Sequence, residues 1–175
     1  MRYLVISCSL NPKSRSRILA QIAQQHLTAR KLEADFIDLR ELPLPMCDAG
    51  ACYSDPNVVA LTPRITEARG IILATGIYNY DVNAAAKNLV ELTGDAWDDK
   101  VVGFVCAAGG HGSYMSVMPF ANSLMLDFRC VIIPRFVYAP PAKLDAKLFG
   151  DTVIHQRTEE LATELIRITD ALFPK

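Results

Sequence analysis

The sequence has no excess of charge of either sign and no long apolar run. Its 18 basic and 19 acidic residues give a formal net charge of −1 at pH 7, so nothing indicates a basic surface for nucleic acid or for an anionic membrane. The apolar run at the N-terminus ends at Ile6, which is too short for the core of a signal peptide. We therefore expect a cytoplasmic protein with small-molecule partners, and neither nucleic acid nor a membrane among them.

The chain also lacks a disulfide framework and a metal-binding pattern. Its five cysteines are an odd number, and two of them lie in apolar, strand-like runs, unlike the cysteines of small secreted domains. Cys47 and Cys52 form the one close pair, and no second Cys or His pair completes the ligand set of a zinc site. We interpret the five cysteines as free thiols and predict no metal.

Two nucleotide-binding fingerprints are missing as well. No glycine precedes the first predicted helix, so the lysine-containing glycine loop of phosphate-loop NTPases is absent. The glycine-rich run at residues 109–112 follows a later strand and lacks the third glycine at dinucleotide spacing. Neither ATP hydrolysis nor Rossmann-type dinucleotide binding is therefore indicated.

What is present is an alternation of apolar strands and amphipathic helices. The 175 residues, 51% apolar and 21% charged, predict a single domain over residues 1–175. Short apolar runs predict five buried parallel strands, at residues 3–6, 36–39, 71–75, 101–107 and 131–137. Apolar residues spaced three to four apart predict five helices, which begin near Ser14, after Asp55, at Asn83, at Ser116 and before Leu161. This alternation predicts a doubly wound α/β fold with helices on both faces of the sheet.

Two prolines constrain these helices. Pro63 lies inside the helix after Asp55 and is expected to end or kink it. Pro119 fits only near the first turn of the helix that ends at Phe128.

The loop after the first strand is rich in hydroxyls and cations. Residues 7–17 contain four serines, Asn11 and three cations directly before a helix N-terminus. Free backbone N–H groups and the helix dipole favour an anion at such a place, so we expect a phosphate group there. The alternative is that the serines only cap the helix and the cations stay solvated.

Two further loops lie at the same end of the predicted sheet, where open α/β folds bind ligands. Residues 76–81 carry two tyrosines and an amide that could flank a ring, although ordinary surface packing is an alternative. The glycines at 109–112 let the backbone approach a flat ligand, or else form a plain flexible turn. His111 is either a solvated loop residue or an aid to proton transfer toward a quinone-like acceptor.

Together the three loops resemble the NADPH-dependent FMN reductase family over nearly the whole chain. The first family motif is similar to residues 8–16, with identity at Ser9, Leu10 and Ser14, and the second is similar to Tyr78-Asn79 and Lys87-Asn88. The third is similar to residues 107–113, and residues 42–45 resemble the family's loop after strand two. The resemblance implies a flavodoxin-like sheet of five parallel strands in the order 2-1-3-4-5.

The resemblance also implies the cofactors and the residues that bind them. FMN is expected as the bound flavin, with NADPH or NADH as reductant. The FMN-binding residues implied on the three loops are Ser9, Asn11, Ser14, Arg15, Ser16, Ile77, Tyr78, Asn79, Ala108, Gly109, Gly110 and Gly112. We name no catalytic residue, because the flavin itself carries the hydride chemistry.

The function expected from this resemblance is an NAD(P)H-dependent reductase that passes hydride through FMN to a small-molecule electron acceptor. Free flavin, a quinone, an azo compound and a metal oxyanion remain open as acceptors. The alternatives are a flavodoxin-type electron carrier and a non-catalytic flavin-binding or regulatory module. A homodimer or homotetramer is expected, with residues 84–86 and Met115, Met118 and Met125 at the contact, unless these side chains face the core.

Overall fold

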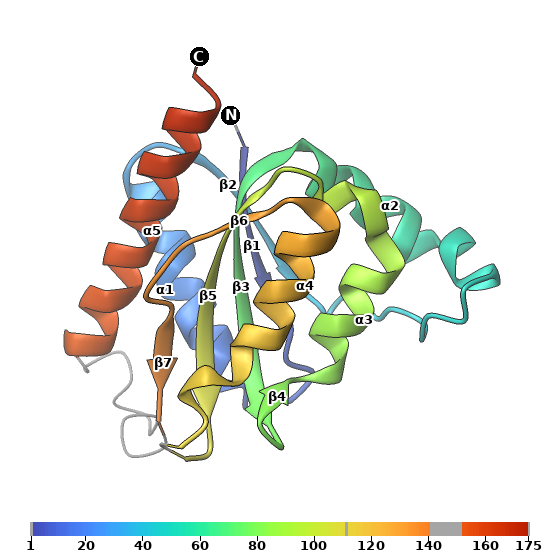
Figure 1. The fold of residues 1–175 in the computed structure, drawn as a ribbon, viewed down its shortest axis with the longest axis horizontal. Helices are drawn as coiled ribbons and strands as arrows, with labels where there is room; N and C mark the ends of the chain where they lie inside the picture. Colours follow the sequence, from blue (N-terminus) through green and yellow to red (C-terminus); the bar gives the residue numbers. More distant parts are fainter. Residues whose placement is uncertain (1, 111, 141–151, 175) are drawn as a thin grey trace.

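The structure is a computed structural model that describes residues 2–110, 112–140 and 152–174. A twisted sheet runs through the middle of the molecule, with helices on both of its faces (Figure 1). His111 and the predicted loop residues Pro141 and Gly150 lie outside the described residues. Within the described ranges, no helix combines the length and the apolar character needed to cross a membrane.

The sheet confirms the predicted flavodoxin-like class. Its strands are β1 (Arg2–Ser7), β2 (Glu33–Asp38), β3 (Ala68–Tyr78), β4 (Asp81–Val82), β5 (Val101–Ala108), β6 (Val131–Ile132) and β7 (Val137–Ala139). They lie in the order β2-β1-β3-β5-β6, with β7 also paired to β5 and β4 paired to β3. Every pairing is parallel except that of β3 with β4. The order 2-1-3-4-5 therefore holds for the predicted strands.

The number of strands differs from the five predicted, because the sheet has seven within the part of the chain that the structure describes. The predicted strand at residues 131–137 is divided into β6 and β7. Pro134 between them has no N–H to donate to the ladder, and Arg135 has a φ of 61°, so the backbone cannot continue as one strand there. The other strand that was not predicted is β4, which is short and forms a hairpin with β3.

Among the described residues, five α-helices lie close to the predicted positions. They are α1 (Arg15–Ala29), α2 (Pro56–Glu67), α3 (Ala84–Thr93), α4 (Met118–Phe128) and α5 (Thr152–Leu172). Ser14 caps α1 and Asp55 caps α2, each by accepting a hydrogen bond from a backbone N–H of the first turn. Gly94, with a φ of 42°, ends α3 as its position suggested. The α4 helix begins at Met118 rather than at Ser116, after the 3-10 turn η3 (Tyr114–Val117).

The prolines behave differently in the two helices that contain them. Pro119 lies in the first turn of α4, as predicted. Pro63 does not end α2, which continues to Glu67. Proline at that position removes the hydrogen bond to the carbonyl of Val59. Val59 is exposed, so water can replace the missing partner.

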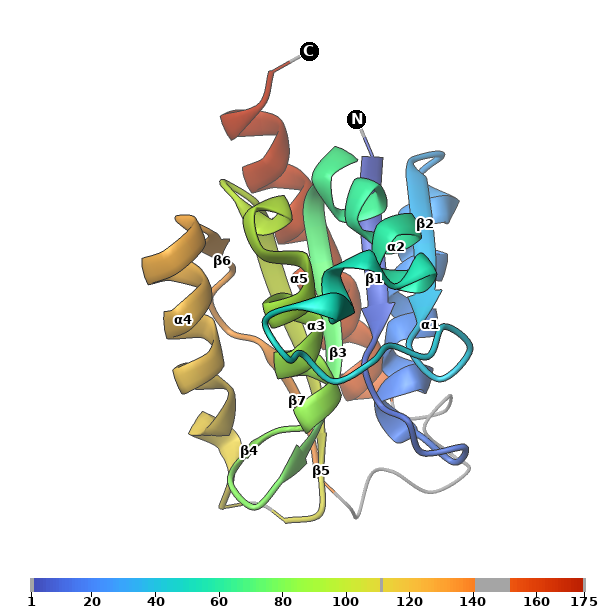
Figure 2. The ribbon, with the colours of Figure 1, turned by 90° about the vertical axis from the view of Figure 1, so that its right-hand side faces the viewer.

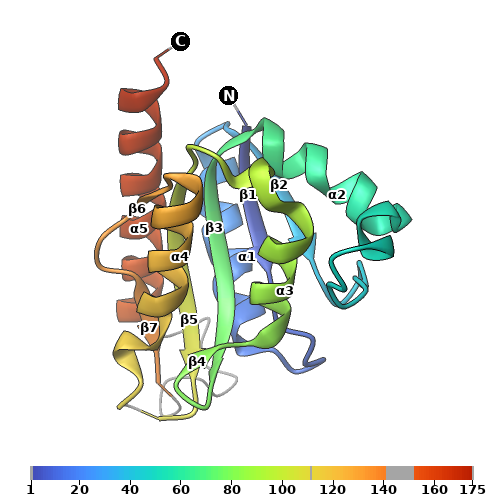
Figure 3. The same cartoon turned by 45° about the vertical axis from the view of Figure 1, so that its right-hand side comes forward.

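The helices form two layers, one on each face of the sheet (Figure 3). The α1 and α5 helices pack on one face against β-strand residues such as Tyr3 and Val5. The α2, α3 and α4 helices pack on the other face, where Leu4 and Ile6 point. Successive residues of β1 therefore enter opposite cores, which explains why the strand reads as a continuous apolar run.

Candidate functional site

Three loops meet at one end of the sheet, because β1, β3 and β5 are parallel neighbours whose carboxyl ends lie at the same edge. That edge is at the bottom of Figure 1, beside the β3–β4 hairpin. With the strand ends that lead into them, these loops are residues 8–14 after β1, residues 76–81 of the β3–β4 hairpin, and residues 107–110, 112 and 113 at the end of β5 and after it. This is the place where open α/β sheets bind their ligands.

The loop after β1 is closed by its own side chains. The Oγ atoms of Ser14 and Ser16, both buried, lie 3.1 Å apart, and Ser14 Oγ also accepts from the N–H of Arg17 at 3.1 Å. The Ser9 hydroxyl accepts from the N–H of Asn11 at 3.4 Å, and Asn11 Oδ1 accepts from the N–H of Lys13 at 2.9 Å. At the start of α1, the first backbone N–H groups have no helical carbonyl to bond, and that of Arg17 is taken by Ser14 Oγ.

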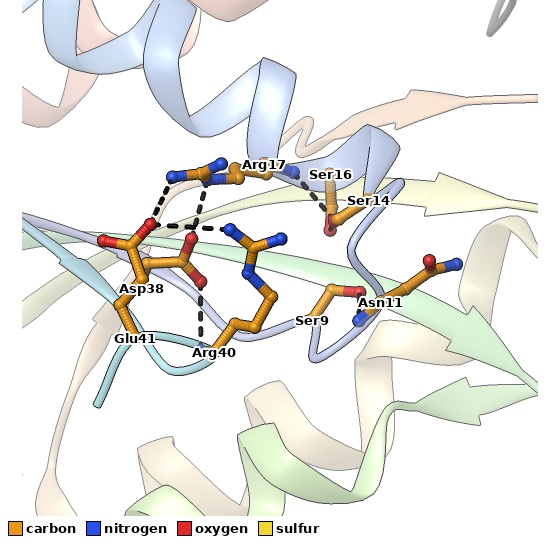
Figure 4. A network of polar contacts seen from close by, with 8 residues as sticks. All are labelled: Ser9, Asn11, Ser14, Ser16, Arg17, Asp38, Arg40 and Glu41. Atoms are coloured by element: carbon orange, nitrogen blue, oxygen red, sulfur yellow. Dashed lines mark hydrogen bonds and ion pairs between the residues drawn. The ribbon is translucent and has the colours of Figure 1, made fainter. Parts of the chain in front are cut away.

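Arg17 is directed away from this loop, toward the end of β2 (Figure 4). Its Nε lies 2.6 Å from Oδ2 of the buried Asp38, and its terminal nitrogen lies 2.9 Å from Glu41 Oε1. The N–H of Arg40 donates to the other oxygen of Asp38 at 3.1 Å. The network ties the first turn of α1 to the end of β2, so Arg17 holds the loop in place while Lys13 and Arg15 remain exposed.

The β3–β4 hairpin presents one tyrosine directly before its turn and one within it. Asn79 and Tyr80 both have positive φ, 52° and 63°, as a two-residue type I′ turn requires. Tyr78 and Asp81 pair across the turn, and both tyrosine side chains are exposed, Tyr78 to 52% and Tyr80 to 74%. The hairpin therefore places its aromatic rings at the rim of the site.

Asn83 fastens the loop after β1 to the end of β3. It is buried, and its Oδ1 accepts from the hydroxyl of Thr75 at 2.6 Å and from the N–H of Gly76 at 3.3 Å. Its Nδ2 donates to the carbonyl of Cys8 at 2.8 Å. Although Asn83 stands at the N-cap position of α3, its side chain makes no capping bond, because these three partners occupy it.

The glycine loop after β5 is braced from β7. The hydroxyl of Tyr138 donates to the carbonyl of Gly110, and it also contacts the Ser113 hydroxyl at 2.6 Å. A Cβ added at Gly109 or Gly110 would meet no atom of the described residues within 4 Å. The described surroundings therefore do not require glycine at these two positions, and the space is open to a ligand that approaches the backbone.

Two adjoining pockets open among these loops. The smaller, about 210 Å³, is lined by all three: Ser9, Asn11, Lys13, Ser14, Arg15, Ser16, Gly76, Ile77, Tyr78, Ala107, Ala108 and Gly109. The larger, about 620 Å³, lies between the hairpin, α3 and α4, and Met46 also lines it. Tyr78 lines both pockets, so the two spaces are neighbours.

Comparison with known proteins shows to which family the chain belongs. Residues 1–143 match the family model described as NADPH-dependent FMN reductase. The chain belongs to the NADPH-dependent FMN reductase family. It is accordingly an NAD(P)H-dependent flavin oxidoreductase, with FMN and a nicotinamide as its cofactors.

Individual relatives agree with this family. An NADPH:quinone oxidoreductase of Arabidopsis thaliana is 30% identical over 145 residues, which are 78% of this chain and 73% of the relative. An NAD(P)H-dependent FAD/FMN reductase of Geobacillus thermodenitrificans is 23% identical over 141 residues, 79% of this chain and 76% of the relative. The solved apo form of an NADH:FMN oxidoreductase superposes with a TM-score of 0.79 at 15% identity, over 99% of this chain and 91% of that one.

The residues of the smaller pocket fit the two ends of FMN. The buried hydroxyls of Ser14 and Ser16 lie at the N-terminus of a 15-residue helix, where a phosphate is stabilised by N–H groups and by the helix dipole. The open space over Gly109 and Gly110 suits a flat ring that approaches the backbone. The smaller pocket thus offers a polar end and an end lined by backbone.

Most of the residues implied by the family resemblance are brought together in that pocket. Nine of the twelve line it; Asn79, Gly110 and Gly112 do not. Asn79 lines the larger pocket instead, and Gly110 offers its carbonyl to Tyr138. A Cβ at Gly112 would lie 3.8 Å from the hydroxyl of Tyr80, so the glycine loop and the hairpin approach each other there.

The sequence does not reveal which residues hold the loops in position. It marks Asn83 only as a helix start and Arg17 only as one of three cations near the expected phosphate, and it does not single out Asp38 or Tyr138. A polar residue at the end of a strand, as Asp38 is, could have indicated a contact at the same sheet edge. The partners of Asn83 and Tyr138 lie 75 and 28 residues away along the chain, and no local pattern contains them.

Proposed function

We propose that this protein oxidises NAD(P)H and reduces a quinone, through FMN held in the smaller pocket. The observation that carries the proposal is that the pocket lined by all three loops shares Tyr78 with a larger pocket beside it. Bound FMN supplies the transfer of a hydride from the nicotinamide and of two electrons to the acceptor. The quinone gains two electrons and two protons and leaves as the hydroquinone.

The loop after β1 would bind the FMN phosphate. Ser9, Ser14 and Ser16 supply hydroxyls, and the first N–H groups of α1 point to the same place. Lys13 and Arg15 line this end of the pocket as well. Their cations add charge-assisted hydrogen bonds to the phosphate oxygens, while Asn11 shapes the turn through its bond to the N–H of Lys13.

The hairpin and the glycine loop would hold the isoalloxazine ring. Ile77, Tyr78 and Asn79 border one edge, and residues 108–112 border another. The backbone N–H groups of a loop without Cβ atoms can donate to acceptor atoms on the rim of the ring. The protein's task is to orient the ring and the nicotinamide and to keep water away from the reacting face.

The larger pocket favours a flat apolar acceptor over an anion. Met46, Val82, Pro119 and Phe120 give it apolar walls. Its one lysine, Lys87, lies 3.1 Å from Glu91 Oε1, so a metal oxyanion would meet a cation that already has a partner. Relatives from Arabidopsis thaliana and Solanum tuberosum carry the name quinone oxidoreductase, which points the same way.

A homo-oligomer and a cytoplasmic location complete the proposal. Met115, Met118 and Met125 expose 60%, 37% and 38% of their surface near α4, as side chains at a contact between copies would. Ala86, in contrast, is fully buried in the core. Sedimentation analysis at micromolar concentration would show a dimer or tetramer, and a monomer would refute this part.

The test of the reaction is anaerobic rapid mixing of the FMN-loaded protein. NADPH should bleach the visible flavin absorbance, and a water-soluble quinone should restore it faster than chromate at equal concentration. Flavin that stays oxidised with either nicotinamide would refute the reductase, and a preference for chromate would refute the acceptor.

A pair of α4 variants tests whether the quinone binds in the larger pocket. Ser123→Phe fills part of it, whereas the neighbouring, exposed Asn122 does not line it and Asn122→Phe serves as control. Ser123→Phe should raise the KM for the quinone and leave flavin reduction by NADPH unchanged. Equal behaviour of both variants would place the acceptor elsewhere.

A further inference from the structure

Two of the five cysteines differ from the others in their surroundings. Cys8, Cys106 and Cys130 are buried in the main core, and burial raises the pKa of the Cys106 thiol to about 12 and that of Cys130 to about 11. Thiols in that state are poor nucleophiles. Cys47 and Cys52 instead belong to a small separate cluster with Val58 and Leu92, next to a surface loop.

The loop folds back so that these two cysteines become neighbours. Cys47 follows β2 on the loop that crosses toward α3 (Figure 2), and Cys52 lies in the 3-10 turn η1 (Ala51–Ser54). The carboxylate of Asp48 accepts from the N–H groups of Gly50 and Cys52 at 2.9 and 3.2 Å. This closed turn brings Cys52 Sγ to 3.4 Å from the backbone N of Asp48, the atom directly after Cys47 in the chain.

The two thiols are unequally accessible. Cys52 is buried, whereas Cys47 is half-buried and its Sγ contacts the Tyr53 hydroxyl at 3.7 Å and the carbonyl of Glu91 at 3.9 Å. Both contacts are long, and both cysteines are free in this structure. Because χ1 of cysteine has three staggered rotamers, the Cys47 sulfur can change its direction by rotation about one bond.

We propose that Cys47 and Cys52 form a reversible disulfide when the protein meets a peroxide. Cys47, the more exposed of the two, loses its proton and its sulfur attacks one oxygen of hydrogen peroxide. The O–O bond breaks, the sulfenic acid forms, and the leaving hydroxide takes up the thiol proton and departs as water. The Cys52 sulfur then attacks the sulfenic sulfur, the S–S bond forms and a second water leaves. The two thiols lose two electrons and two protons, and the peroxide is reduced to two waters. A dithiol reverses the change by thiol–disulfide exchange.

The disulfide would also change the shape of the larger pocket, in which the proposed function places the quinone. This step rests on that proposed function. The N–H of Cys47 donates to Asn88 Oδ1 at 2.8 Å, and Asn88 Nδ2 donates to the carbonyl of Pro45 at 2.8 Å. Asn88 and Met46 both line the larger pocket. Turning the Cys47 side chain releases its contact with Glu91 and shifts the chain on either side of Met46, so one wall of the pocket moves.

Peptide mapping tests the disulfide without any assay of activity. Arg40 and Arg64 bound a tryptic peptide that contains both cysteines and no other lysine or arginine, while Cys106 and Cys130 fall in two other peptides. After hydrogen peroxide and alkylation, the peptide should carry no alkyl group and should have lost two hydrogens. The peptides of Cys106 and Cys130 should be alkylated after unfolding as before. Two alkylated cysteines, or Cys47 oxidised to the sulfinic acid with Cys52 still free, would overturn the proposal.

Kinetics of the same samples test the link to the pocket. Oxidised wild-type protein should show a KM for the quinone raised about 2- to 30-fold, the range for a shifted element beside a site, at unchanged FMN content. Cys47→Ser, which cannot form the bond, should show no rise after the same treatment. A disulfide that leaves the KM unchanged would overturn the link, and loss of quinone reduction in the untreated protein would instead count against the proposed function.

Discussion

The loop after β1 and the glycine loop after β5 border the same pocket but are built in opposite ways. In the first, the hydroxyls of Ser9, Ser14 and Ser16 already take part in hydrogen bonds, and Arg17 is anchored to Asp38. In the second, Gly109 and Gly110 face open space, and the bracing contact comes from Tyr138 on β7. A loop that is ordered before binding loses little entropy when it binds. We therefore propose that the first loop supplies most of the affinity for FMN and that the second leaves room for the ring.

We expect the largest effect from a substitution of Asn83, because its side chain joins the first loop to β3. Asn83→Ala leaves the buried Cys8 carbonyl and Gly76 N–H without their partner. We expect the free energy of unfolding to fall by about 2–3 kcal/mol and FMN affinity to fall with it. Chemical denaturation measures the first and FMN titration the second. Asn122→Ala, an exposed site on α4, is the control, and an equal loss there would contradict the role of Asn83.

Gly109→Val tests the proposed difference between the two loops most clearly, because it should lower FMN affinity without lowering stability. A Cβ at this position meets no protein atom within 4 Å, so the stability of the free protein should change by less than about 0.5 kcal/mol. FMN affinity should fall by about 1–3 kcal/mol, the cost of an overpacked contact. Gly50→Ala, on the cysteine loop, should change neither quantity. Unaltered FMN affinity in Gly109→Val would show that the ring does not approach this loop.

Ser14→Ala removes both a helix cap and a phosphate donor. The cap accounts for about 0.5–2 kcal/mol of stability, and Asp55→Ala, the corresponding cap of α2, should cost a similar amount. Only Ser14→Ala should also weaken the binding of FMN. It should leave the binding of riboflavin unchanged, because riboflavin has no phosphate. A parallel loss of riboflavin affinity would mean that Ser14 acts through the fold alone.

The smallest expected effect is on the pH dependence of stability, and it comes from a residue remote from both loops. His26 belongs to α1 and contacts Thr163 and Glu159 of α5. Burial and the nearby Arg30 lower its pKa, which Glu159 partly offsets. Between that lowered pKa and the ordinary value of about 6.5, the unfolded chain binds a proton that the folded chain does not, so stability falls as the pH falls through this window. His26→Gln should reduce the fall, measured by thermal unfolding at several pH values, without altering FMN affinity. An unchanged pH profile would show that another group is responsible.

Much of the fold was predictable because its signals are local. Apolar runs gave the strands, and Ser14, Asp55 and Gly94 marked helix ends by their own backbone chemistry. The break at Pro134 was overlooked because the apolar run continues on both sides of it. The three loops were found from their composition and their place after the strands. Asn83 and Tyr138 were not, since their roles depend on partners that only the folded chain brings near.

The most direct test of the account compares FMN with riboflavin as ligands of the wild-type protein. The two share the ring that the glycine loop accommodates and differ in the phosphate that the loop after β1 would bind. Each charge-assisted hydrogen bond to the phosphate should contribute about 1.5–3 kcal/mol. Titration followed by flavin fluorescence should therefore show FMN bound at least tenfold more tightly, by ~1.4 kcal/mol or more. Equal affinity for the two flavins would contradict the assignment of the phosphate to residues 9–16.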